Sequence, residues 1–167
     1  MSHEDPLLAS LPAASLLALA YAPARARLPT LALLALDARL AGLLRHSREP
    51  MLAQLRLSGW RESLGQDAGA WPAGEPLLVA LRSWNGHHGA LSALVDGWEA
   101  LTGPAPLPQE ALLQMAQGRA EAFAGLARAL DQEDQAASAS RLGLQWGLFD
   151  LALHLGDARE REAAASL

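Results

Sequence analysis

Leucine and alanine recur at helical spacing along almost the whole chain, and this pattern limits the fold more than any other feature. Residues three and four apart lie on one face of an α-helix. β-branched residues, which favour strands, are nearly absent, since the 167 residues include no Ile, two Val and two Thr. The pattern predicts an all-α protein. Its clearest stripe consists of Leu113, Ala116, Ala120, Phe123, Ala127 and Leu130.

Prolines and glycines divide this pattern into about seven helices. Short connections between helices favour an antiparallel bundle. We expect a single helical domain over residues 1–167, with an ordered core over 10–155 and a frayed tail over 157–167. The expected helices span residues 10–21, 29–46, 50–64, 76–84, 91–101, 113–130 and 142–153.

The predicted core consists of large apolar side chains on these helical stripes. Amphipathic helices in a bundle bury such stripes against one another. The residues expected inside are Leu33, Leu36, Leu40, Leu55, Leu81, Leu94, Trp98, Phe123, Trp146 and Phe149.

Charge and residue usage argue against several classes of protein. The formal net charge is −5 and every basic residue is Arg, so a nucleic-acid partner is not expected. The absence of Cys excludes disulfides and thiolate metal sites and is compatible with a cytoplasmic location. The acidic start is not typical of a secretory signal. Residues 28–44 include Asp37 and Arg39, and this segment is too short and too charged to be a transmembrane span.

Asp37 is the first residue that indicates chemistry. It shares a helix face with Leu33 and Leu40, and a carboxylate on an apolar stripe is costly unless it is paired or faces a cavity. Two interpretations remain open, a ligand-site acid and a buried acid that pairs with Arg56 or Arg61. The helices expected at 29–46 and 50–64 are joined by a tight turn, and residues at similar distances from such a turn lie opposite each other. This geometry favours a cluster of Asp37 with the helix that carries Arg56 and Arg61.

Arg56, Trp60 and Arg61 are the further binding-site candidates. Arg56 precedes Trp60 by four residues, so its guanidinium can contact the indole. Three weaker groupings have no third ligand beside them, and we therefore expect no metal site. These groupings are His87 with His88, Asp96 with Glu99, and His154 with Asp157.

Several segments of the chain resemble the squalene/phytoene synthase family. They are Tyr21-Ala22-Pro23, Leu36-Asp37-Ala38-Arg39-Leu40-Ala41, Arg48-Glu49-Pro50-Met51 and Leu55-Arg56-Leu57-Ser58-Gly59-Trp60-Arg61-Glu62-Ser63-Leu64. The resemblance implies a shortened isoprenoid-synthase-like bundle, with Asp37 as the first residue of an Asp-x-x-x-Asp metal motif. It also implies that Asp37, Arg56, Trp60 and Arg61 are a vestigial substrate-binding set.

The family's aspartate motifs are incomplete in this chain. Ala41 stands where the first motif has its second Asp. In the segment that matches the second motif, residues 147–158, Asp150 stands where the family has Asn, and His154 and Ala158 stand where it has Asp. One carboxylate cannot hold a magnesium–diphosphate cluster as two or three do. The resemblance therefore implies no condensation of prenyl diphosphates, no catalytic residue and no cofactor.

Two classes of function follow for a member without condensation activity. The first is a module that binds an isoprenoid or lipid in a cavity between the helices at 29–46, 50–64, 113–130 and 142–153. The second is an interaction protein, similar to an assembly factor, and an exposed stripe with Trp71 or Trp84 would favour it. The alternative to both is a functional prenyltransferase that joins prenyl diphosphates head to head with magnesium. Peripheral contact with a membrane is compatible with each.

Overall fold

The computed structural model describes residues 4–46 and 49–167, and this part of the chain is helical without any strand. The prediction of an all-α helical bundle is confirmed. Four short 3-10 turns occur between the α-helices. No helix in the described residues is long and apolar enough to cross a membrane. The α-helices are α1 (Asp5–Ala9), α2 (Ala13–Ala20), α3 (Ala24–His46), α4 (Pro50–Leu64), α5 (Pro76–Leu81), α6 (Ser92–Ala100), α7 (Gln109–Ala129), α8 (Ala136–His154) and α9 (Ala158–Ser166).

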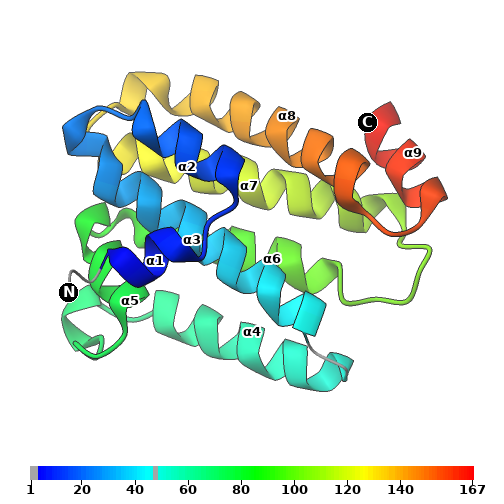
Figure 1. Ribbon diagram of the computed structural model, residues 1–167, viewed down its shortest axis with the longest axis horizontal. Helices are drawn as coiled ribbons and strands as arrows, with labels where there is room; N and C mark the ends of the chain where they lie inside the picture. Colours follow the sequence, from blue (N-terminus) through cyan, green and yellow to red (C-terminus); the bar gives the residue numbers. More distant parts are fainter. Residues whose placement is uncertain (1–3, 47–48) are drawn as a thin grey trace.

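The long helix α7 is the centre of the bundle. It packs between α6 on one side and α8 on the other, and α3 crosses in front of them (Figure 1). Helix α4 packs against α6 and α3 at the lower edge of this view. The two short helices α1 and α2 form an outer layer over α3. A site between α3, α7 and α8 is therefore covered on its outer side by α2.

The α6–α7–α8 layer is close-packed because glycines face its helix contacts. A Cβ added at Gly118 of α7 would lie 2.4 Å from the carbonyl oxygen of Ala93 in α6. A Cβ added at Gly143 of α8 would lie 2.8 Å from the carbonyl oxygen of Arg119. Since neither position has room for a side chain, the backbone of α7 is nearly in contact with both neighbours.

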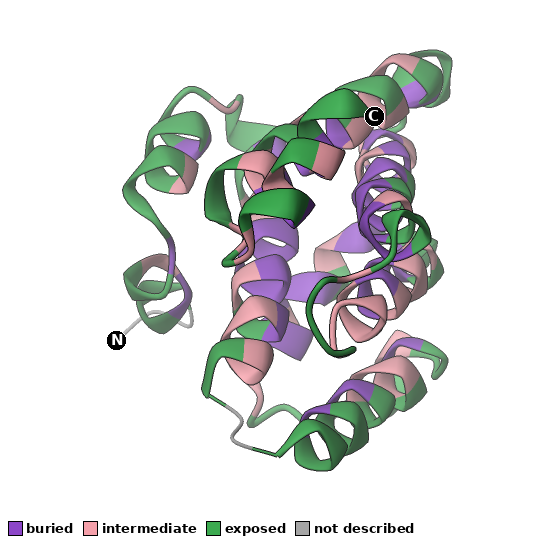
Figure 2. Cartoon of the chain, turned by 90° about the vertical axis from the view of Figure 1, so that its right-hand side faces the viewer, coloured by how far each residue is buried: buried purple, intermediate pink, exposed green. Residues whose placement is uncertain are grey.

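The predicted core is largely confirmed, with two errors. Leu55 and Phe149 are exposed, by 69% and 64%. Helix α4 buries Leu57 instead of Leu55. Helix α8 contacts α7 through Gly143 and Gly147, so Phe149 lies outside that contact. The purple inner faces and green outer faces in Figure 2 show this division. Leu33, Leu36, Leu40, Leu81 and Leu94 are buried, and Trp98, Phe123 and Trp146 are partly buried against the core.

Several helix boundaries differ from the sequence expectation, and α1 was not expected. Helices α7 and α8 begin at Gln109 and Ala136, ahead of the expected starts at 113 and 142. Helix α3 begins at Ala24 and contains Pro29, whose carbonyl accepts a hydrogen bond from Trp84 Nε1 at 3.0 Å. The expected frayed tail at 157–167 instead contains α9. Asp157 caps this helix by accepting from the backbone N–H of Arg159 at 2.8 Å. Buried Glu160 accepts from the backbone N–H of Leu107 at 2.7 Å, which fixes α9 to the loop before α7.

Candidate functional site

A buried ionic cluster joins α3, α7 and α8. Arg119 of α7 donates from Nη2 to Asp37 Oδ2 at 3.1 Å and from Nη1 to Asp150 Oδ2 at 2.7 Å. Trp98 of α6 donates from Nε1 to the second oxygen of Asp37 at 2.8 Å. His154 Nδ1 lies 3.0 Å from Asp150 Oδ1. Asp37 and Arg119 are therefore a buried ion pair whose carboxylate has both oxygens engaged.

Two indoles complete the surroundings of Arg119. The carbon of its guanidinium lies 4.4 Å from the ring centroid of Trp146 and 5.6 Å from that of Trp98. Burial by itself would lower the pKa of Arg119, but the carboxylates of Asp37 and Asp150 outweigh it and raise the pKa above its ordinary value. Nε of Arg119 is buried without a hydrogen-bond partner in the described part of the chain. The guanidinium is therefore permanently charged and held by two carboxylates and two aromatic faces.

A cavity of about 620 Å³ lies beside this cluster. Its lining along α3 runs from Leu34 to Arg45, a separation of eleven positions and hence about 16 Å of helix. Several lining residues of α2 and α8 are exposed, so the cavity reaches the surface. Its polar lining includes Asp37, Arg119, Asp150, His154 and Arg45. Its apolar lining includes Leu34, Ala38, Ala41, Leu44, Trp98, Leu101, Phe123, Trp146, Leu151 and Leu155.

The sequence-derived set of Asp37, Arg56, Trp60 and Arg61 is not brought together. Arg61 donates from Nε to Asp96 at 2.8 Å and also pairs with Glu99, so it ties α4 to α6. The hydrogen bonds that Arg61 donates to Glu99, and secondly to Asp96, raise the pKa of Arg61. The expected pairing of Asp37 with the Arg56 helix is wrong, because that helix packs on α6 and away from the Asp37 face of α3.

The other two members of the expected set also lie outside the cavity. Arg56 is exposed, and its expected contact with the Trp60 indole is not among the cation–π contacts of the described residues. Trp60 is partly buried and packs on the core. The cavity is therefore lined by α2, α3, α6, α7 and α8, and α4, which the sequence analysis placed at its wall, takes no part.

The residues of the three weaker groupings also make contacts other than those of a metal site. His154 contacts Asp150, whereas Asp157 caps α9. His88 is buried with its ring 4.6 Å from that of Trp71, and its Nε2 lies 3.0 Å from the carbonyl oxygen of Gln66. No three His, Asp or Glu side chains in the described ranges are close enough to hold a metal ion.

Arg119 is the site residue that sequence reasoning missed. A signal for it exists, because Arg119 follows Met115 by four residues and precedes Phe123 by four, on the buried stripe of α7. A lone arginine on such a stripe needs a buried carboxylate. Its partner Asp37 stands 82 residues earlier in the chain.

The carboxylates do not fit the magnesium-bound diphosphate that the family resemblance implies. Asp37 uses both oxygens on Trp98 and Arg119, and Asp150 uses one on Arg119, while His154 Nδ1 hydrogen-bonds the backbone carbonyl of Asp150. A magnesium site needs carboxylate oxygens that are free to bind the ion. The guanidinium already supplies the positive charge between these two acids.

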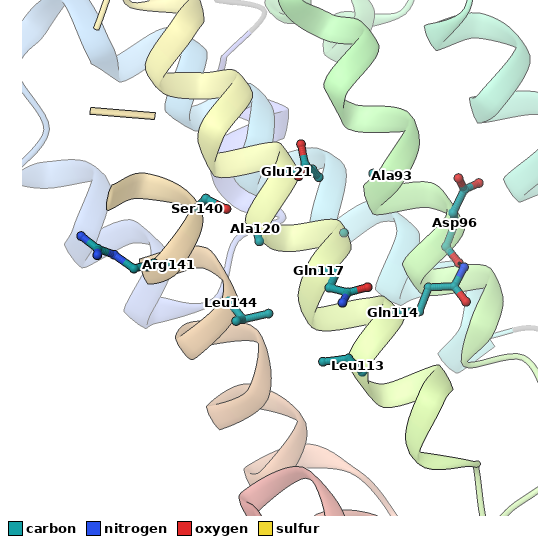
Figure 3. Close-up of a pocket in the computed structure, with 11 residues that line it drawn as sticks. Ala93, Asp96, Leu113, Gln114, Gln117, Ala120, Glu121, Ser140, Arg141 and Leu144 are labelled. Atoms are coloured by element: carbon teal, nitrogen blue, oxygen red, sulfur yellow. Dashed lines mark hydrogen bonds between the residues drawn. The ribbon is translucent and has the colours of Figure 1, made fainter. Parts of the chain in front are cut away.

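A second hollow of about 520 Å³ lies on another face, over the close contact of α6, α7 and α8 (Figure 3). Its walls mix apolar and polar residues, with Gln114 next to Asp96 and with Arg141 pointing away from α7. Asp96 is already paired with Arg61. The hollow contains no buried charged group, so the Arg119 cavity is the better candidate for a ligand site.

Comparisons with family models, curated proteins and solved structures give no match to this chain.

Replacing Trp98 by phenylalanine should lower the free energy of unfolding by about 1–2 kcal/mol, because Asp37 loses a hydrogen bond from a neutral donor while buried. The matched control is Trp60→Phe, since Trp60 is also partly buried but its indole makes no hydrogen bond among the described residues. Urea denaturation of both variants measures the difference. Equal losses would show that the Trp98–Asp37 hydrogen bond contributes nothing.

Proposed function

We propose that this protein binds an elongated apolar molecule, an isoprenoid or lipid, between α2, α3, α7 and α8 and does not transform it. The cavity beside the Arg119 cluster is the observation that carries the proposal. Its volume, about 620 Å³, is typical of small-molecule sites. A largely apolar wall with a few convergent polar groups is also typical of such sites.

The lining supports a long ligand with one polar group. Along α3, Leu34 precedes Asp37 by about one turn, and Ala41 and Leu44 follow it by about one and two turns. Apolar wall therefore lies on both sides of the ionic cluster. A chain-like molecule can place a hydroxyl near Asp37 and Asp150 and its hydrocarbon along the remaining wall.

The charge of the cluster favours an alcohol or other neutral group over a diphosphate. Asp37, Asp150 and Arg119 together carry one net negative charge, since Arg119 is the one cation among them. A diphosphate beside them would meet like charge in a poorly solvated site. Arg45 lies at the α3 end of the lining and is exposed, so an anionic group would sit better there.

The two other classes of function have less support. An exposed stripe with Trp71 or Trp84 would favour the interaction-protein hypothesis, but both are buried, with exposures of 3% and 0%. The prenyltransferase alternative is favoured by one observation, that Asp37 and Asp150 from the two family-like segments meet at one cavity. Three of their four carboxylate oxygens are engaged by Arg119 and Trp98, which is the arrangement of a structural cluster. Formation of a presqualene or phytoene product with magnesium would establish that alternative.

Ligand binding should disappear when the cavity is filled. The variant Ala41→Leu places three more carbons in the wall, and Ala38→Leu does the same one turn earlier. We expect either change to weaken binding of a radiolabelled long-chain isoprenoid alcohol by about tenfold or more in equilibrium dialysis. The control is Ala165→Leu, because Ala165 is an exposed alanine of α9 away from the cavity. Unchanged affinity in both cavity variants, or no binding by the parent protein, would refute the proposed site.

A further inference from the structure

Helix α2 is the outer wall of the Arg119 cavity, as its place on the outside of the bundle shows (Figure 1). It contributes Ala14, Ser15 and Ala18 to the lining. Leu19 is the one buried residue of this helix, whereas each of the other helices that line the cavity buries several. A helix held by a single buried side chain loses little apolar contact when it moves away from the bundle.

The sequence of α2 provides little else to hold the helix in place. Ala13–Ala20 contains no charged side chain and one polar side chain, Ser15, so no ion pair can fix it. Pro12 and Pro23, which flank the helix, have no backbone N–H to donate, and Pro12 provides no side-chain cap. An isolated helix shorter than about twelve residues is marginal in water. The eight residues of α2 therefore depend on their packing against the bundle, and local opening requires little free energy.

The closed position of α2 restricts access to the cavity wall on α3. Leu34 and Asp37 of α3 line the cavity, yet each is only 8% exposed. Helix α2 packs on α3, and its Ala14 and Ala18 line the same cavity. Opening of α2 therefore exposes the α3 wall to solvent and to a ligand.

A bound ligand would act on the same helix. An apolar molecule in the cavity contacts Ala14 and Ala18, and these contacts exist only while α2 is closed. A ligand that binds one of two conformations more tightly shifts the population toward that conformation. Ligand binding and closure of α2 are therefore coupled.

We propose that α2 is a lid that opens by local unfolding between Pro12 and Pro23 and closes over a bound ligand. Leu19 anchors the closed lid in the hydrophobic core. The role of the lid in ligand entry rests on the proposed function, whereas its opening is a property of the free protein.

Hydrogen exchange in the free protein tests the opening. We expect the backbone amides of residues 16–20, which are hydrogen-bonded within α2, to exchange about a hundredfold faster or more than the central amides of α7. Helix α7 packs between α6 and α8, so its amides become accessible only when the bundle itself unfolds. Protection of the α2 amides equal to that of the α7 amides would overturn the lid.

A single cysteine reports the same opening, because the chain has none of its own. Leu34→Cys places a thiol in the α3 wall, and its rate of labelling by a water-soluble maleimide measures how often that wall is accessible. We expect Leu19→Ala to raise this rate about tenfold or more, since the substitution removes the buried side chain that holds α2. Leu17→Ala should leave the rate unchanged, because Leu17 is 62% exposed on the same helix.

A second cysteine separates lid opening from a general loss of stability. Leu57→Cys places a thiol in α4, at a position that is fully buried and does not line the cavity. We expect Leu19→Ala not to change the labelling rate at this position. Equal acceleration in the Leu57→Cys and Leu34→Cys proteins, or no acceleration in the Leu34→Cys protein, would overturn the lid.

The lid and the ligand proposals can fail separately. A long-chain isoprenoid alcohol should slow exchange of the α2 amides in the parent protein more than that of the α4 amides, because α4 does not line the cavity. Binding in dialysis without any slowing in α2 would contradict closure over the ligand. Absence of binding by the parent would contradict the proposed function, while the exchange and labelling rates of the free protein would still decide whether α2 opens.

Discussion

Arg119→Met should lower the free energy of unfolding by about 3–5 kcal/mol, the largest effect that we expect from a single substitution in this protein. The change removes the cation that pairs with both Asp37 and Asp150. Asp37 would keep one hydrogen bond from Trp98 but would remain a buried carboxylate without a counter-charge. Chemical denaturation of the variant beside the parent measures the loss.

The matched control is Arg128→Met on the same helix. Arg128 pairs with Glu133 at 3.3 Å, and the two side chains are 37% and 76% exposed. An exposed ion pair contributes at most about 1 kcal/mol, so this variant should be close to the parent. The double variant Asp37→Leu with Arg119→Met should recover part of the loss, because no buried carboxylate remains on α3. A loss below about 1 kcal/mol for Arg119→Met would contradict the buried cluster.

The second large effect is expected at Gly118, where the backbones of α6 and α7 nearly touch. Gly118→Ala should lower the free energy of unfolding by about 1–3 kcal/mol, because the new methyl group would lie 2.4 Å from the carbonyl oxygen of Ala93. This oxygen belongs to the backbone of α6, so the two helices must separate to relieve the contact. Thermal or urea unfolding of the variant measures the effect.

Gly59→Ala gives a control of opposite sign. Gly59 is an exposed residue inside α4, and a Cβ at this position meets nothing within 4 Å. Alanine is the better helix former, so this variant should be more stable by about 0.5–1 kcal/mol. If Gly118→Ala were stabilising to the same extent, the close approach of α6 and α7 would be wrong.

The fold class could be predicted because it depends on local patterns. The helical period of Leu and Ala, with few β-branched residues, determines which segments are helices and which faces they bury. Leu36 and Leu94 are buried as that pattern predicts. The tail was harder, because its helix α9 depends on a distant contact, the hydrogen bond from Leu107 to Glu160.

The site could be predicted only in part, for the same physical reason. The apolar stripe around Asp37 indicates that its carboxylate is paired or faces a cavity, and in the structure it does both. The choice of partner depends on which helix packs against that face of α3. Proximity in sequence favoured Arg56 and Arg61, whereas α7 brings Arg119 there from far along the chain. The tight connection invoked for that choice includes residues 47 and 48, which lie outside the described part of the chain.

A crystal structure of the protein with a long-chain isoprenoid alcohol that carries a terminal bromine tests the central proposal most directly. The anomalous signal of bromine locates the hydrocarbon end without assumptions about the rest of the ligand. We expect one strong peak inside the cavity lined by Leu44, Leu101, Phe123 and Trp146, with the hydroxyl near Asp37 or Asp150. The same crystals of Ala41→Leu should lack the peak. A cavity that stays empty in the parent protein, or a bromine peak on another face, would contradict the account.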